Sequence, residues 1–359
     1  MSAGKPERLV NLDILRLASA IMVLLFHYGF RMQISGESGG LGFPELAPFA
    51  MWCDAGLLIF FGISGYVITM SAQDRSAYDF AVGRVARLWP SFIVCATITA
   101  GVLAIWPVPT IAPPTIQQWL AHGIIISRAL GQPFLDGAYW TIAYEIIFYG
   151  WVFLLIATGL FQRQWRLIVT VWLSVSVANE ALLHSGALQK LLITQYSGYF
   201  AFGLVLFRLR QSFSVSGCCM LLAATCWATA APFITEAEFL ATYGFHRNMG
   251  GLFLMGPLAV ICVAVAALGP SMPIRPRLAM ALGGLTYPLY LLHQNIGYAA
   301  FAHFGTPGNR WTVMALVLTI LLLASSLIAR TVEPAARRSV TRLGASLRSN
   351  LSRRIQREA

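Results

Sequence analysis

Long apolar segments recur along almost the whole chain, with short polar connections between them. A helix needs roughly 20 mostly apolar residues to cross a bilayer, and ten segments reach or approach that length. We expect spanning helices at residues 10–31, 50–71, 88–106, 139–160, 165–183, 193–208, 216–234, 250–268, 280–303 and 311–330. The pattern therefore predicts an all-α, polytopic transmembrane helix bundle with no separate soluble catalytic domain.

One connection, residues 107–138, is long enough to have structure of its own. A Pro-rich start is followed by a short apolar helix, which we expect over residues 117–126. Two interpretations stay open: an interfacial helix that covers one face of the bundle, or a lid that gates a substrate site.

Composition excludes a soluble globular protein. Hydrophobic residues make up 57% and charged residues 11% of the chain, and the mean hydropathy is +0.68, whereas soluble domains carry about 25% charged residues. Lys5 and Arg8 precede the first apolar run as in a signal peptide, but the run contains Asp13, Arg16 and His27 and lacks a convincing cleavage site. We expect a retained first span.

The distribution of Lys and Arg predicts the orientation of the bundle. With the N-terminus inside, nineteen of the 25 basic residues fall in inside segments, and Arg16 lies within the first span. The outside segments hold only Arg31, Arg128, Lys190, Arg247 and Arg310. Since short cytoplasmic loops are enriched in Lys and Arg, we predict that both termini are cytoplasmic. The net charge of +11 then reflects topology and not nucleic-acid binding.

The chain divides into a transmembrane domain at residues 1–334 and a basic cytoplasmic tail at residues 335–359. We interpret the tail as an electrostatic contact with anionic membrane lipids. The six cysteines lack metal-binding spacing and mostly lie in apolar runs, so we expect them to pack and expect no metal site.

Ionisable residues inside spans are costly and are functional candidates by default. Arg16 and His27 are eleven residues apart, which places them about 20° past three full turns on one helix face and about 16 Å apart along the axis. Glu145 lies about two turns inside the fourth span, at the depth of His27. A histidine is suited to taking a proton from an alcohol, and a carboxylate at that depth would orient it. The alternative for Glu145 is a structural hydrogen bond to Tyr144 or Tyr149.

Arg84 and Arg87 lie one helical turn apart at the inner entrance of the third span. Two guanidiniums so spaced suit phosphate groups, although anchoring at the membrane surface would use the same residues. Ser64 and Gly65 allow close approach of a ligand or of another helix. Tyr290 and His293 share one face of the ninth span and could line the same cavity.

Together these segments resemble the acyltransferase-3 family of bacterial membrane O-acyltransferases. Five motifs match in order along essentially the entire chain, with small departures at Thr286 and at Thr141-Ile142-Ala143. They are Leu12-Asp13 through His27, Phe60 through Ile68 with its Ser-Gly-Tyr at Ser64 to Tyr66, Arg84 with Arg87 before an aromatic-Pro pair, Trp140 through Glu145, and Thr286 through His293.

The resemblance implies transfer of an acyl group, commonly acetyl, from cytoplasmic acyl-CoA to a hydroxyl of an exported carbohydrate or lipid-linked glycan at the bacterial inner membrane. It implies that His27 is the catalytic base with Arg16 as its motif partner, that Arg84 and Arg87 lie near the CoA phosphates, and that Glu145 lies in the catalytic cavity. Further cavity residues are expected to be Ser64, Tyr66, Trp140, Tyr144, Tyr290 and His293.

Two other functions would use the same sequence features. A transporter or flippase would use the charged cavity without covalent chemistry, and a non-catalytic subunit of a polysaccharide export assembly would not need Arg84 and Arg87 for acetylation. The absence of an internal repeat makes a transporter the weaker alternative. The acceptor, the acyl length and the oligomeric state are not encoded in any motif.

Overall fold

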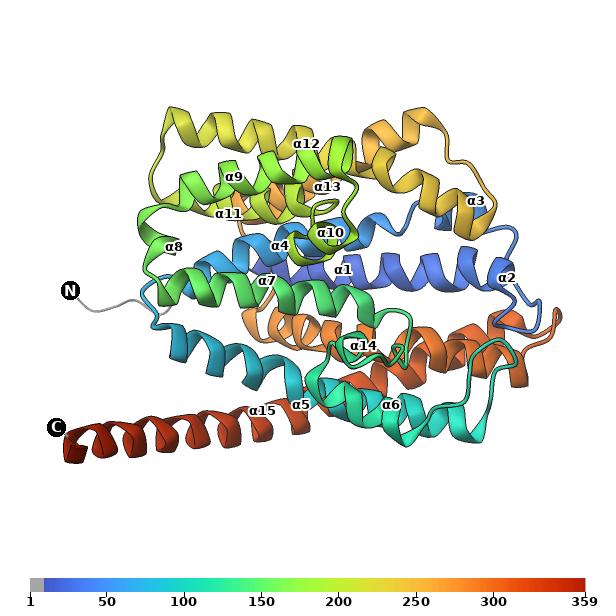
Figure 1. The fold of residues 1–359 in the computed structure, drawn as a ribbon. Helices are drawn as coiled ribbons and strands as arrows, with labels where there is room; N and C mark the ends of the chain where they lie inside the picture. The colour runs from blue at the N-terminus through green and yellow to red at the C-terminus, as the bar shows by residue number, and fades with distance from the viewer. Residues whose placement is uncertain (1–9, 359) are drawn as a thin grey trace.

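The structure, a computed structural model, describes residues 10–358 and consists of helices joined by mostly short connections (Figure 1). No strand occurs within these residues. The first half holds α1 (Val10–Phe26), the π-helical segment η1 (His27–Arg31), α2 (Met32–Ser35), α3 (Ala47–Ala50), α4 (Ala55–Ala72), α5 (Ala77–Ile105), α6 (Ile116–Ala121), the 3₁₀ turns η2 (His122–Ile124) and η3 (Ser127–Leu130), and α7 (Tyr139–Ala157). The second half holds α8 (Leu160–Arg163), α9 (Trp165–Ala178), the π-helical segment η4 (Asn179–Leu183), α10 (Gly186–Leu192), α11 (Ser197–Gln211), α12 (Val215–Tyr243), α13 (Met249–Leu268), α14 (Pro276–Phe304) and α15 (Arg310–Glu358).

The predicted helix bundle is confirmed. Within residues 10–358, nine helical segments are long and apolar enough to cross a membrane. The remaining predicted span, the ninth, is α14, which is 29 residues long but carries buried polar side chains, among them His293, Gln294 and Asn295. Because α14 packs against α1, α5 and α15, these side chains face protein and not lipid.

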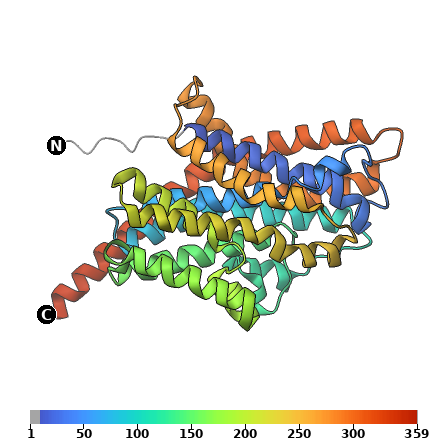
Figure 2. The same cartoon turned by 90° about the horizontal axis from the view of Figure 1, so that it is seen from above.

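The start of α1 and the end of α15 lie at the same end of the bundle (Figure 1), as an even number of crossings requires. We call this the terminal end, and the opposite end, where residues 107–138 lie, the loop end. Seen from above, the long helices run roughly along one common direction (Figure 2).

Three helices extend well beyond the spans expected from hydropathy, among them α12, which ends at Tyr243 and not at 234. α5 begins at Ala77 and not at 88, with Ser76 as N-cap accepting a hydrogen bond from the Asp79 amide at 3.1 Å. α15 continues past 330 to Glu358 as one helix, so the basic tail prolongs the last span. Hydropathy finds only the part of a helix that lies in lipid, whereas capping and packing decide where the helix ends.

Two buried clusters form the interior. One joins α4 to α11, α12 and α13, and the other joins α1 and α14 to α5 and α15. α4 and α11 approach most closely at Gly65 and Gly203, where an added Cβ would collide with the backbone of the facing helix. Gly65 therefore serves helix packing, one of the two roles predicted for this segment.

The loop end is held by buried polar groups. The Arg247 side chain is almost fully buried and donates to Glu236 at 2.8 Å and to Asp54 at 2.9 Å. In residues 107–138, His122 is also buried, its Nδ1 2.7 Å from the Gln118 carbonyl and its Nε2 accepting from the Leu135 amide at 3.0 Å. Burial lowers the pKa of His122, which keeps the ring neutral in these two bonds. The short helix expected over residues 117–126 is present as α6 only at Ile116–Ala121, and two 3₁₀ turns follow it.

Candidate active site

The first span carries Arg16 within α1 and His27 where α1 ends. The guanidinium of Arg16 lies 3.3 Å from the carboxylate of Asp13, one turn earlier. At His27 the backbone changes to the π-helical segment η1, which runs to Arg31. Single π-helical turns within helices are rare and are often found at functional sites. The local backbone thus singles out His27 independently of its side chain.

Three guanidiniums line one cavity at the junction of the two buried clusters. Arg16 comes from α1, and Arg84 and Arg87 come from α5. Arg84 lies over the ring of Tyr149 at 5.7 Å from its centroid, and its Nε is buried without a hydrogen-bond partner among the described residues. Three cations that face one space repel one another unless an anion joins them, so the cluster suits a group with several negative charges.

Glu145 of α7 is the acidic side chain in the lining of this cavity. Ser64 Oγ of α4 donates to Glu145 Oε1 at 2.8 Å, and the Tyr149 hydroxyl donates to the same oxygen. Ser64 therefore lines the site, whereas the neighbouring Gly65 serves packing. The bond from Tyr149 is the structural hydrogen bond that sequence left open for Glu145.

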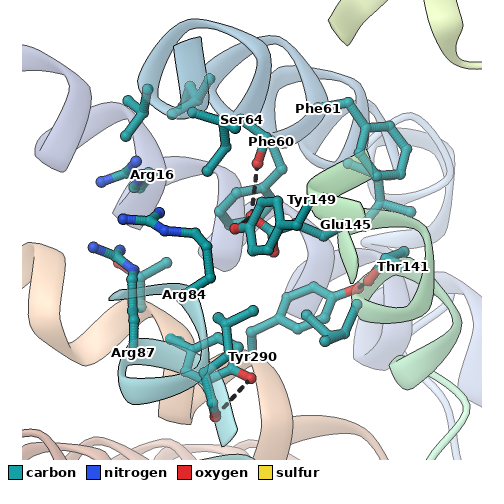
Figure 3. Close-up of a pocket in the computed structure, with 18 of the residues that line it drawn as sticks. Arg16, Phe60, Phe61, Ser64, Arg84, Arg87, Thr141, Glu145, Tyr149 and Tyr290 are labelled. Atoms are coloured by element: carbon teal, nitrogen blue, oxygen red, sulfur yellow. Dashed lines mark hydrogen bonds between the residues drawn. The ribbon is translucent and has the colours of Figure 1, made fainter. Parts of the chain in front are cut away.

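The cavity has a volume of about 90 Å³ and is partly open. Figure 3 shows Arg16, Arg84 and Arg87 grouped on one side, Glu145 with Ser64 and Tyr149 in the middle, and Thr141 and Tyr290 beyond them. The Tyr290 hydroxyl lies 2.7 Å from Thr141 Oγ1, which joins α14 to α7. The walls are mainly apolar and aromatic, among them Phe60, Leu88 and Tyr287.

His27 and His293 form a buried pair behind Tyr290. Their ring centroids are 5.0 Å apart, and the His293 ring lies 5.5 Å from that of Tyr290. His27 Nδ1 is 2.9 Å from the Tyr298 hydroxyl. His293 Nδ1 lies 2.7 Å from the Tyr290 carbonyl, and its Nε2 has no partner within the described chain. Neither histidine is part of the cavity lining, but Tyr290, whose ring contacts His293, is part of it.

The expected pair of Glu145 with His27 is not formed. Glu145 bonds Ser64 and Tyr149, while the partner of His27 is Tyr298 of α14. Similar depth in the membrane does not make two residues neighbours, because α14 packs directly on α1 and supplies the partner of the histidine.

Besides His293, three expected cavity residues lie outside the cavity lining. Tyr66 is fully buried and accepts from Arg210 at 3.0 Å. Trp140 and Tyr144 pack around Tyr196, with ring centroids 5.9 and 6.1 Å from it. Trp140 and Tyr144 stabilise the wall formed by α7 and α11 without reaching the cavity. They lie on the same helix as Glu145, but their side chains leave the helix in other directions.

Sequence reasoning missed Tyr149 and Tyr298 as parts of the site. Tyr149 is one turn after Glu145 and was considered only as a structural partner, although its position on the same face was a usable signal. Tyr298 reaches His27 across the contact between α14 and α1, and no spacing in the sequence indicates such a contact.

Asp136 is a buried carboxylate near the end of residues 107–138. It accepts from the amides of Asn295 and Ala138, both at 2.9 Å, and so fixes the end of residues 107–138 to α14. Burial raises the pKa of Asp136 to about 7. No group of three or more His, Cys, Asp or Glu side chains with metal-binding geometry occurs in residues 10–358.

Comparison with known proteins gives two matches. A family model described as an acyltransferase domain matches residues 9–330. An O-acetyl transferase of Shigella phage Sf6 is 24% identical over 257 residues, which cover 67% of this chain and 70% of the phage protein. No solved structure matches.

Proposed function

Because the chain belongs to the acyltransferase-3 family, whose model covers most of it, we propose that it transfers an acetyl group from acetyl-CoA to a hydroxyl of an exported or surface carbohydrate. O-acyl transfer follows from the family and from the phage relative. Acetyl-CoA as donor, a carbohydrate as acceptor and the bacterial inner membrane as location belong to the proposal.

The cluster of Arg16, Arg84 and Arg87 in one cavity supports this donor most strongly. CoA carries a diphosphate between its nucleotide and its pantetheine arm, and guanidiniums bind phosphate oxygens through paired, charge-assisted hydrogen bonds. The buried, unpaired Nε of Arg84 is the kind of donor that such a ligand would satisfy.

The acyl end of the donor would extend from the arginines past Glu145 and Tyr290 to the histidine pair. Arg16 and His27 are about 16 Å apart along the first span, a distance comparable to an extended pantetheine arm. The acceptor hydroxyl would enter from the loop end. The arginines would thus face the cytoplasm, where acyl-CoA is made, in agreement with the orientation predicted from Lys and Arg.

In the proposed reaction His27 takes the proton of the acceptor hydroxyl, and the hydroxyl oxygen attacks the thioester carbonyl carbon. The new C–O bond forms, the C–S bond breaks, and the CoA sulfur takes up a proton as it leaves. A positioned base of this kind typically contributes 10²- to 10⁴-fold in rate. The dry surroundings of His27, which is 7% exposed, keep water from competing with the acceptor.

The decisive experiment measures thioester consumption by the purified protein in nanodiscs with labelled acetyl-CoA, together with mass spectrometry of surface glycans. We expect CoA release, a gain of about 42 Da per modified hydroxyl, and loss of both signals in His27→Ala. Transfer that survives in His27→Ala would refute the role of His27. A protein that binds acetyl-CoA but never consumes it would be a transporter or subunit.

The arginines are tested by Arg84→Gln and Arg87→Gln, with Arg163→Gln as a control that removes an exposed charge on α8 outside the cavity. Losing one charge-assisted hydrogen bond costs about 1.5–3 kcal/mol, so the KM for acetyl-CoA should rise roughly 10- to 150-fold in the first two variants. An equal effect in all three variants would show that only surface charge matters.

A further inference from the structure

A second cleft lies at the terminal end, between the first turns of α5 and the tail part of α15. It is lined by Arg75, Asp79 and Gly83 on the α5 side and by Arg337, Thr341 and Arg348 on the α15 side. Its volume is about 460 Å³, which is within the size of small-molecule sites. We call it the α5–α15 cleft.

The cleft is a built feature and not a gap beside a loose tail. The Tyr78 hydroxyl donates to the Gly344 carbonyl at 2.6 Å, and Arg348 pairs with Asp79 at 3.1 Å. A Cβ added at Gly344 would lie 3.0 Å from a methyl group of Val82, so glycine allows the close approach of the two helices. α15 is therefore fixed on α5 well beyond the last span.

The charge of the cleft is positive. Three arginines face one carboxylate, Asp79, which is already engaged by Arg348 and by the Ser76 hydroxyl at 2.6 Å. The N-terminus of α5 adds its partial positive charge beside Ser76. The Arg75 guanidinium lies over Gly83, 3.4 Å from where a Cβ would be, and so is directed along the cleft. Thr341 adds a hydroxyl donor.

α5 lines both the cleft and the active-site cavity. Asp79, Gly83 and Arg87 follow one another at intervals of four residues, so they lie on neighbouring positions of the same face. Arg87 lines the cavity, while the first two line the cleft. On the facing helix, Glu333 accepts from Ser91 at 3.4 Å, and Arg337 follows Glu333 by one turn.

We propose that the α5–α15 cleft binds the 3′-phosphoadenosine end of the acyl-CoA donor, with Arg75 and Arg337 as ligands of the 3′-phosphate. The inference rests on the proposed function. CoA has a diphosphate and a phosphomonoester separated by one ribose. α5 presents Arg84 and Arg87 in the cavity, and the Arg75 guanidinium lies beside Gly83, which precedes Arg87 by about one turn, roughly 6 Å along the axis. A lipid phosphate shares this chemistry, but it would not account for the position of the cleft next to the cavity on the same helix.

The test compares acetyl-CoA with acetyl-dephospho-CoA, and adenosine 3′,5′-bisphosphate with adenosine 5′-monophosphate, on the purified full-length protein. Arg75→Gln and Arg337→Gln are measured beside Arg338→Gln, which removes an exposed charge next to Arg337 but outside the cleft. In the wild type and in Arg338→Gln, the 3′-phosphate should improve KM and nucleotide affinity by roughly 3- to 10-fold, or about 0.7–1.4 kcal/mol.

In Arg75→Gln and Arg337→Gln, this preference should shrink toward one, while the KM for acetyl-dephospho-CoA stays at its wild-type value. Equal use of both donors by the wild type, or a preference that survives in both variants, would overturn the inference and leave the proposed function intact. Binding of adenosine 3′,5′-bisphosphate without any thioester consumption would overturn the proposed function, but the cleft would still be a site for the 3′-phosphoadenosine group.

To distinguish a lipid phosphate from the donor's 3′-phosphate as the ligand of the cleft, the same comparison is made in two kinds of nanodisc. One contains phosphatidylcholine alone, and the other contains phosphatidylcholine with phosphatidic acid. We expect the preference for the 3′-phosphate in both. A preference that disappears with phosphatidic acid in the wild type would show that lipid phosphate occupies the cleft, which would refute the assignment to the donor.

Discussion

The hydrogen bond between Tyr298 and His27 can be removed without changing the size of either side chain. Tyr298 is fully buried, and its hydroxyl lies 2.9 Å from His27 Nδ1. If Nδ1 donates to this oxygen, the ring is held in the tautomer whose Nε2 can accept a proton. Tyr298→Phe leaves Nδ1 without its partner, and both the tautomer and the ring orientation lose their restraint. Tyr298 is thus a positioning residue for the proposed base.

The size of the effect follows from the burial of both groups. Leaving a buried polar atom unpaired costs about 1–3 kcal/mol, and each 1.36 kcal/mol of activation free energy is a tenfold change in rate. If the cost appears in the transition state, kcat falls roughly 5- to 150-fold. The KM for acetyl-CoA should stay constant, because Tyr298 is not part of the cavity lining.

A matched control is available in the same helix contact. Tyr28 is also fully buried, and its hydroxyl donates to the backbone carbonyl of His293 and not to His27. Tyr28→Phe therefore removes a comparable hydrogen bond without touching the proposed base. Steady-state kinetics with acetyl-CoA and a glycan acceptor, with thermal unfolding measured in parallel, would compare the two variants with the wild type.

The reasoning predicts a kcat loss in Tyr298→Phe that exceeds the loss in Tyr28→Phe by at least about fivefold at similar stability. An unchanged kcat in Tyr298→Phe would refute the positioning role. Equal losses in both variants would show that the helix contact as a whole, and not the bond to His27, supports turnover.

Three further changes have defined outcomes. Glu145→Gln keeps an oxygen that can accept from Ser64 and Tyr149 but removes the charge that faces the arginines. If Glu145 transfers a proton, kcat should fall roughly 10²- to 10⁴-fold while the protein elutes as the wild type does in size-exclusion chromatography; full activity would contradict a catalytic role. Burial raises the pKa of Asp136 from 3.8 to about 7, so the folded state holds its proton more tightly, and its contribution to stability is lost as pH rises from about 4 to about 7. The melting temperature should fall with rising pH across this range in the wild type and fall less in Asp136→Asn. The same pH dependence in both proteins would contradict a raised pKa of Asp136. Arg247→Met leaves Asp54 and Glu236 without their buried cation, and the expected loss of about 3–5 kcal/mol should appear as a lower melting temperature than in Lys190→Met, which removes an exposed charge.

Sequence predicted the existence of the helices better than their ends. The apolar runs placed the spans, because a bilayer requires helices of about 20 apolar residues. α14 was found despite its polar residues, and the same residues make it the helix that holds Tyr290, His293 and Tyr298. The extension of α5 to Ala77 and of α15 to Glu358 depends on the Ser76 cap and on contacts between the two helices, which hydropathy does not report.

For the site, the motifs identified the ionisable residues but not their partners. Arg16, Arg84, Arg87 and Glu145 were expected together, and they line one cavity. The expected bond from Glu145 to His27 was wrong, since the helix positions divide the site into an arginine side with Glu145 and a histidine side behind Tyr290.

The sequence by itself determined a helical membrane protein, the residues able to carry charge within it, and the family to which they point. These properties follow from hydropathy and residue type, which are local. Only the tertiary structure decided that Tyr298 meets His27, that Ser64 meets Glu145 while Tyr66 and Trp140 do not reach the cavity, and that the basic tail closes a cleft over the start of α5. Each of these depends on which helix faces which and at what rotation, and that is fixed by packing between segments far apart in the chain.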